Sequence, residues 1–323
     1  PLLSATNQVR EEFRKHFPFP LVLWVTDEVL QRVSRLAPDF ESWATTTDFT
    51  LDTATLTRSL QEGANHLFET LLTPESNLSF NRLLRQLNFG PLRLPELGAA
   101  LRELQQREQP LAPDIQASLE FFQGVMNPDR TAAIEAFHRS LAFWEAQMQT
   151  ETESEPNIPQ SQISPDLKAG LLRFYIGQFL YYRVYRDDER STDWQTTRQY
   201  LTQAIALFDQ ANRPDLAAKC TIHLQRVLER IGEWTELEAL ARRSLQLYQT
   251  YGTLSRPTQN YRYLAVAAMH RQDWHAACGY AQQAWEQLAE VPEDHHWQGL
   301  YLLTRAQAQL GLGDRDQAIH LLE

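Results

Sequence analysis

Apolar residues recur every three or four positions along most of this chain, which is the period of a helix with one buried face. The clearest stretch, residues 261–285, reads as a helix, a tight turn and a second helix that opens at Trp274. Trp234 and Trp194 hold the same place in two earlier stretches, at intervals of 40 residues. One helical hairpin cannot bury its apolar face alone, so a fixed interval of this length is typical of stacked hairpins. The pattern therefore predicts an all-α solenoid.

The same periodicity predicts a series of helices after residue 52. Helices are expected over residues 53–72, 79–87, 95–108, 114–126, 130–147, 167–186, 215–231, 233–249, 258–271, 273–289, 296–311 and 314–323, with a further one opening near Trp194. From residue 114 on, these helices pair as hairpins.

The first 52 residues follow a different pattern. Residues 7–19 read as a charged helix, and residues 21–25 form a short continuous apolar run that fits a buried strand. A helix is expected over 28–37, closed by Pro38, and residues 47–51 fit a second short strand. The order helix, strand, helix, strand predicts a small α/β element.

These patterns divide the chain into five segments. Residues 148–166 are polar, acidic and proline-bearing, which predicts a flexible linker that interrupts the hairpins. The expected segments are an α/β element (1–52), a helical connecting region (53–110), a first hairpin (111–147), the acidic linker (148–166) and a repeat array (167–323).

Composition limits the classes of partner. The net charge of the 323-residue chain is −11, so it has no general attraction to nucleic acid. No apolar run reaches the roughly 18–20 residues needed to span a bilayer, so no membrane partner is expected. Cys220 and Cys278 both fall within helical patterns, which favours free thiols in a reducing, cytoplasmic setting. The basic residues are mostly arginine, which suits carboxylate recognition but is also a common composition bias.

The hairpin motif resembles the tetratricopeptide repeat. That family places small residues, a turn glycine and an aromatic at set spacings. The matching residues here are Leu264, Ala265, Trp274, Ala277, Ala281 and Ala284, then Gly232, Trp234, Leu237 and Ala241, then Ala306, Gly313 and Ala318. The resemblance implies a right-handed α-solenoid of such hairpins that binds protein or peptide. The interval of 40 exceeds the family's usual 34, which leaves a related helical-hairpin variety open.

A second resemblance covers the N-terminus. The segment PLVLWVTDEVLQRVSRLAPDFESWATTTDF is similar to the end of the P-loop NTPase core in bacterial signal-transducing ATPases that carry helical repeats. No GxxxxGK[ST] phosphate loop occurs in this sequence, so the resemblance implies a nucleotide-binding part outside it. A small α/β cap without that ancestry stays open.

The first helix of each hairpin lines the inner groove in arrays of this kind, and its non-core positions are the candidate binding residues. They form a basic and aromatic strip made of Gln178, Tyr181, Tyr182, Lys219, Arg226, Arg230, Arg262 and His270. Such a strip could hold carboxylates of an acidic peptide or partner segment through charge-assisted hydrogen bonds. The alternative is that these arginines are solvated and paired with Glu229 and its neighbours.

Another set of residues is expected to have a structural role only. The tryptophans should pack between the two helices of their own hairpin, and the small residues should let helices approach closely. These repeat positions are Trp194, Trp234, Trp274, Ala277, Ala281, Ala284, Gly313 and Ala318.

The sequence offers no constellation for catalysis. Cys220 and His223 lie three apart on a helix but lack an orienting third group, so a core thiol is expected. The histidines at 270, 275, 295 and 296 lack the spacing of a zinc site, and the acidic turn at 187–189 lacks the glycine of a calcium loop. We therefore expect no enzyme, no metal and no cofactor.

Two functional hypotheses follow. The first is a non-catalytic interaction scaffold that binds an acidic peptide or partner segment. The second is the sensor or regulatory arm of a signal-transducing ATPase whose nucleotide-binding part is missing from this chain. The identity of the partner and the existence of a homo-oligomer stay open.

Overall fold

A computed structural model describes residues 15–16, 22, 24–25, 27–37, 45, 51–73, 94–127, 129–152, 163–187, 191–251, 257–289 and 295–322. The chain divides into two compact units, Pro1–Asp52 and Thr53–Glu323. Every regular element among the described residues is a helix, which confirms the all-α class for this part of the chain.

The first unit contains α3 (Asp27–Leu36), which confirms the helix predicted after residue 26. The predicted strand at 21–25 is not confirmed. Its described residues Val22, Trp24 and Val25 lie outside any regular element and are exposed. A short apolar run forms a strand only where a second strand pairs with it, and the composition of the run does not decide whether that pairing forms. The second predicted strand, apart from Leu51, lies outside the described residues.

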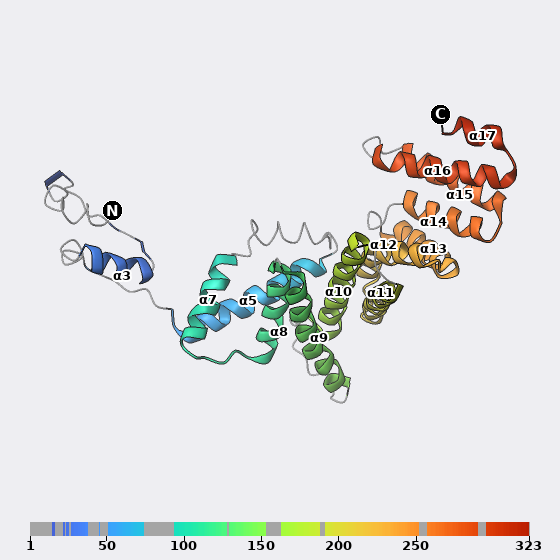
Figure 1. Cartoon of the computed structure of the whole chain (residues 1–323). Helices are drawn as coiled ribbons and strands as arrows, with labels where there is room; N and C mark the ends of the chain where they lie inside the picture. The colour runs from blue at the N-terminus through green and yellow to red at the C-terminus, as the bar shows by residue number, and fades with distance from the viewer. Residues whose placement is uncertain are drawn as a thin grey trace. The chain divides into compact units, whose positions relative to one another are not determined.

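The second unit is a succession of helices, drawn from light blue to red in Figure 1. They are α5 (Thr53–Leu72), α7 (Leu94–Gln106), α8 (Pro113–Met126), α9 (Arg130–Thr152), α10 (Pro165–Asp187), α11 (Ser191–Gln210), α12 (Pro214–Ile231), α13 (Trp234–Tyr251), α14 (Pro257–His270), α15 (Trp274–Ala289), α16 (His295–Leu312) and α17 (Arg315–His320). The helix predicted at 79–87 lies outside the described residues.

Helix α9 is longer than the sequence pattern predicts. It continues to Thr152, five residues into the segment expected to be a linker. No glycine or proline occurs in the chain between residues 131 and 155, and Met148 still packs against the core. Polar composition alone therefore does not end a helix that lacks a breaker.

From α8 on, each helix packs against the next one in the chain, and α10 also contacts α12. The helices α10, α12 and α14 are the first members of three successive hairpins, and we call them the first-helix layer. One continuous apolar core runs from α5 through these hairpins to Leu264 in α14. Beyond it, α14 to α16 share two small clusters, one of Ala268, Ala277 and Ala308 and one of Ala284, Leu288 and Tyr301.

The turns inside the hairpins repeat the same backbone geometry. Gly232, Gln272 and Gly313 adopt positive φ angles of 78°, 62° and 88°. The residue after each one donates its N–H to a carbonyl five positions earlier, which is the bond that closes a helix C-terminus. Glycine adopts this conformation without strain, and glutamine does not.

Two of the three repeat tryptophans join neighbouring hairpins. The ring of Trp234 stacks on His270 of the next hairpin, with centroids 3.6 Å apart and planes 9° apart. Trp274 lies against the backbone of α16, where a Cβ added at Gly311 would come within 2.0 Å of its ring. Trp194 instead meets Tyr181 of its own hairpin. The expectation of packing within one hairpin therefore missed the contacts of Trp234 and Trp274 to the next.

The small repeat residues are buried. Ala277, Ala281, Ala284 and Ala318 are each at most 2% exposed. Their size lets the second helix of a hairpin approach the first closely.

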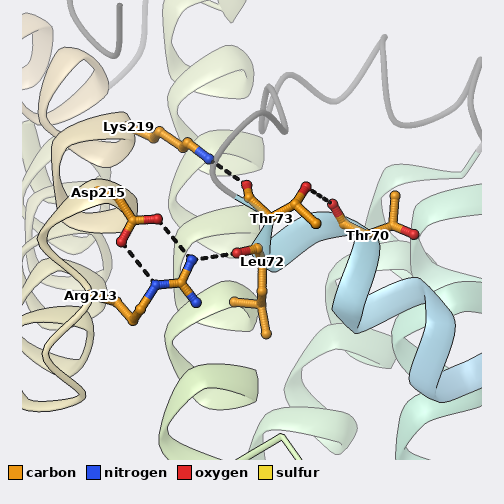
Figure 2. Close-up of polar contacts among 6 residues, drawn as sticks. All are labelled: Thr70, Leu72, Thr73, Arg213, Asp215 and Lys219. Atoms are coloured by element: carbon orange, nitrogen blue, oxygen red, sulfur yellow. Dashed lines mark hydrogen bonds and ion pairs between the residues drawn. The ribbon is translucent and has the colours of Figure 1, made fainter. Parts of the chain in front are cut away.

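A long-range tie joins α5 to the start of α12 (Figure 2). Lys219 Nζ donates to the carbonyl oxygen of Thr73 at 2.9 Å, and Arg213 donates to the carbonyl oxygen of Leu72. Asp215 holds the Arg213 guanidinium through two hydrogen bonds of 2.9 and 2.8 Å. Cations are favourable at a helix C-terminus, where carbonyl groups lack partners. These contacts fix the end of α5 against the hairpin that α12 and α13 form.

Candidate functional site

One face of α12 carries a basic stripe. Lys219, His223, Arg226 and Arg230 follow at intervals of four, three and four residues, so they share one side of the helix. Among them His223 is buried, Lys219 and Arg226 are half-buried, and Arg230 is exposed. The stripe lies in the middle of the first-helix layer, with α10 on one side and α14 on the other.

The predicted binding residues are divided between the surface and the interior. Tyr182, Arg230 and His270 are exposed, Lys219 and Arg226 are half-buried, and Gln178, Tyr181 and Arg262 are buried. Lys219 is engaged with α5, and His270 is the stacking partner of Trp234.

Arg262 links α14 to α12. It is 8% exposed and donates to Glu229, and its guanidinium lies 5.2 Å from the centroid of the Tyr263 ring. Burial raises the pKa of Glu229, while the charges of Arg262 and Arg226 act in the opposite direction. For Arg262, the structure therefore agrees with the alternative interpretation, in which the arginine pairs with Glu229.

A polar pair links α10 to α12. Gln178 Nε2 lies 2.9 Å from His223 Nε2, and both side chains are buried. The rings of Phe174, Tyr181 and Tyr182 surround the histidine, with centroids 5.6 to 6.3 Å from its own. Burial first, and the charge of Arg226 second, lower the pKa of His223 to about 3, so the imidazole is neutral near pH 7.

Sequence reasoning missed His223 as a member of this site. The sequence pattern relates the histidine only to Cys220, as a weak nucleophile pair. The available signal was its place in the stripe, four residues after Lys219 and three before Arg226.

A second buried network fixes α12 against its other neighbours. Gln225 Nε2 donates to Asn260 Oδ1 of α14 at 2.7 Å and to Ser244 Oγ of α13 at 3.3 Å. Buried polar contacts of this kind are directional, so they select one register between packed helices. The helices of the first-helix layer are therefore held by specific polar contacts as well as apolar packing.

Three ion pairs join neighbouring hairpins. Arg173 pairs with Glu145, Arg198 with Glu236, and Arg243 with Asp209, each across two helices. These side chains are partly exposed, so each pair adds little to stability. These pairs give Arg173, Arg198 and Arg243 a structural role between helices.

The described residues offer little for catalysis or metal binding. Cys220 is fully buried, and burial raises the pKa of its thiol well above the usual value, so it is a core thiol as predicted. No group of three His, Cys, Asp or Glu side chains in the described ranges could hold a metal ion. None of the described helices combines the length and the apolar character that crossing a bilayer requires.

A pocket of about 660 Å³ lies where α5 ends and where α10 and α12 begin. Its lining consists of Glu69, Leu72, Thr73, Ile163, Leu167, Asn212, Arg213, Pro214 and Asp215. None of the predicted binding residues lines it. It adjoins the tie between α5 and α12 shown in Figure 2.

The described residues form an all-helical fold of stacked hairpins. Comparison with known proteins agrees with this class. The chain is similar to RapI, in the crystal structure of its apo form, with a TM-score of 0.51 and 12% identity over 99% of this chain and 74% of RapI. This similarity concerns the fold, which is compatible with a tetratricopeptide-like repeat. No protein-family model and no curated protein matches the chain.

Proposed function

We propose that this chain is a non-catalytic interaction scaffold that binds an acidic peptide or partner segment along the first-helix layer. The observation that carries this proposal is the basic stripe of α12 on a chain whose net charge is −11. Most of an acidic protein surface repels an acidic partner. A basic strip on that surface attracts carboxylates, so it is the place where such a partner would bind.

Arg226 and Arg230 are the residues assigned to the carboxylates. Both lie on the stripe, and Arg230 is exposed while Arg226 is half-buried. Guanidinium groups bind carboxylates through two parallel hydrogen bonds, which suits recognition of Asp, Glu or a C-terminus. Lys219 and Arg262 have support roles, because each already bridges two helices.

The aromatic part of the strip would contact apolar side chains of the same segment. Tyr182 is 45% exposed and lies on α10, beside the stripe. His270 extends the strip onto α14. Gln178 and Tyr181 are buried beneath this surface.

The test is a pull-down from lysate of the source cells with three baits. The first bait is wild type, and the second is Arg226→Glu/Arg230→Glu. The third is Arg58→Glu/Arg102→Glu, which changes charge equally at two exposed arginines of α5 and α7. Circular dichroism checks that all three are equally helical. We expect a partner that binds wild type and the third bait and is lost by the second, whereas equal capture by all three contradicts the proposal.

A second candidate function is the sensor or regulatory arm of a signal-transducing ATPase. Pro1–Asp52 forms a compact unit separate from the array, and this unit carries the segment that resembles the end of an NTPase core. The gene upstream of the codon for Pro1 tests this function. A reading frame that continues upstream with a GxxxxGK[ST] motif supports it, and a start codon directly before Pro1 contradicts it.

A further inference from the structure

The polar pair between α10 and α12 leaves two atoms without hydrogen bonds. Gln178 is 2% exposed and His223 is 8% exposed. Their nitrogen atoms meet at 2.9 Å, yet Gln178 Oε1 and His223 Nδ1 have no partner among the described residues. A buried polar atom without a partner costs about 1–3 kcal/mol, so native proteins rarely retain one without a reason.

The hydrogen-bonding groups of the pair determine which kind of ligand group can bind to it. If the Gln178 amide donates to Nε2, the neutral imidazole carries its proton on Nδ1 and the amide offers Oε1 as an acceptor. If the amide is turned over, the amide offers a donor and Nδ1 becomes the acceptor. In both arrangements the pair offers one donor and one acceptor, and neither is charged.

The surroundings restrict the size and polarity of a ligand group. Phe174 and Tyr181 are buried around the histidine, whereas Tyr182 is 45% exposed. Tyr182 is therefore the most exposed of the three rings around the histidine, and exposed side chains change rotamer within nanoseconds. Arg226 lies one turn further along the same face of α12.

We propose that the Gln178–His223 pair binds one amide group of the partner segment, either a backbone peptide unit or the side chain of Asn or Gln. An amide carries both an N–H donor and a C=O acceptor, which matches the one donor and one acceptor that the pair offers. A carboxylate has only acceptors and would leave one acceptor of the pair without a partner. This proposal rests on the proposed function, because it assigns a subsite of the same strip.

The test starts from octapeptides selected from a random displayed library on wild-type protein. The affinity of each selected peptide is then measured for Gln178→Leu/His223→Phe, which replaces both polar groups by apolar ones of similar shape. We expect at least tenfold weaker binding. The variant should melt no lower than wild type, because replacing both partners removes the two unpartnered atoms.

The source of the amide is found on wild-type protein, so this arm does not depend on folding of a variant. Each backbone amide of the peptide is N-methylated in turn, and each Asn or Gln is changed to Ala. One position should lose about tenfold in affinity. Loss on N-methylation identifies a peptide unit, and loss on Ala substitution identifies a side-chain amide.

The outcomes separate this proposal from the proposed function. If the Gln178→Leu/His223→Phe protein binds within twofold of wild type, or if no amide position matters, the pair holds at most a buried water and the proposal is wrong. If instead Arg226→Glu/Arg230→Glu binds the same peptides as wild type, the acidic-segment function is wrong while the amide subsite stands. Selection of no peptide by wild type contradicts both.

Discussion

At the scale of single residues, burial rather than residue type decides which side chains of the strip can meet a partner. Arg226 and Arg262 look alike in sequence, as arginines on first helices, but Arg262 is buried in a pair with Glu229. Periodicity gives the face of a helix on which a residue lies. It does not tell whether the next helix covers that face. The sequence pattern therefore predicts the strip as one surface, although Gln178, Tyr181 and Arg262 of the strip are buried.

The buried histidine makes stability depend on pH. The pKa of His223 is lowered to about 3, against an ordinary value of about 6.5. As pH falls from 6.5 toward 3, the unfolded chain takes up a proton at this residue and the folded chain does not, so stability is lost. Between pH 7 and pH 5 the loss should be about 2 kcal/mol.

The matched variant for this prediction is His223→Gln, which keeps a hydrogen-bonding group beside Gln178 but does not titrate. Urea unfolding at pH 7 and pH 5 should show that this variant loses about 2 kcal/mol less than wild type over the range. An equal loss in both proteins would mean that His223 takes up its proton in the folded state as readily as in the unfolded one.

The turn residues give a second prediction at this scale. Gln272 has the positive φ of 62° that Gly232 and Gly313 adopt in the equivalent turns. Gln272→Gly should therefore raise the free energy of unfolding by about 1 kcal/mol, and Gly232→Ala should lower it by about the same amount. A Cβ at Gly232 would make only an ordinary contact of 3.6 Å with Trp234, so the cost there is backbone strain. A lower melting temperature for Gln272→Gly, or a higher one for Gly232→Ala, would contradict this explanation of the turns.

At the scale of elements, the hydrophobic period predicted the helices well. The expected helix at 53–72 coincides with α5, and most others agree within a few residues. The exceptions have physical reasons. Helix α9 continues into polar residues because nothing breaks it. The contact of α5 with α12 joins residues more than 140 positions apart, through carbonyl groups that every sequence possesses.

The junction between α15 and α16 tests the role of the tryptophans. A Cβ at Gly311 would come within 2.0 Å of Trp274, whereas one at Gly299 of the same helix would meet nothing within 4 Å. Gly311→Ala should therefore destabilise the C-terminal hairpin by about 1–3 kcal/mol, because the ring must move. The matched variant Gly299→Ala should stabilise it by up to about 1 kcal/mol through helix propensity. Chemical unfolding of both variants measures the difference, and two equal shifts would refute the close packing of Trp274.

At the scale of the whole molecule, the core is unevenly distributed along the second unit. A continuous cluster with many aromatic side chains runs from α5 to α14. The helices after it are joined by two small clusters, Ala268, Ala277 and Ala308 in one and Ala284, Leu288 and Tyr301 in the other. Four of these six residues are alanine, which buries little area, so these helices gain less from packing. In a repeat protein, stability is roughly a sum over neighbouring interfaces.

Native-state hydrogen exchange should therefore show a gradient. Amides of α16 and α17 should exchange through local opening well before those of α10 and α12, by a factor of ten or more. Exchange of α16 as slow as that of α10 would show that the two small clusters hold their helices as strongly as the aromatic core does.

The central claim is that the first-helix layer is the binding face of this chain. The most direct measurement is hydrogen exchange of the wild-type protein with and without a saturating peptide selected from the displayed library. We expect new protection in α10, α12 and α14, strongest around His223 and Arg226. Protection confined to α11, α13 and α15, or to Pro1–Asp52, would contradict it.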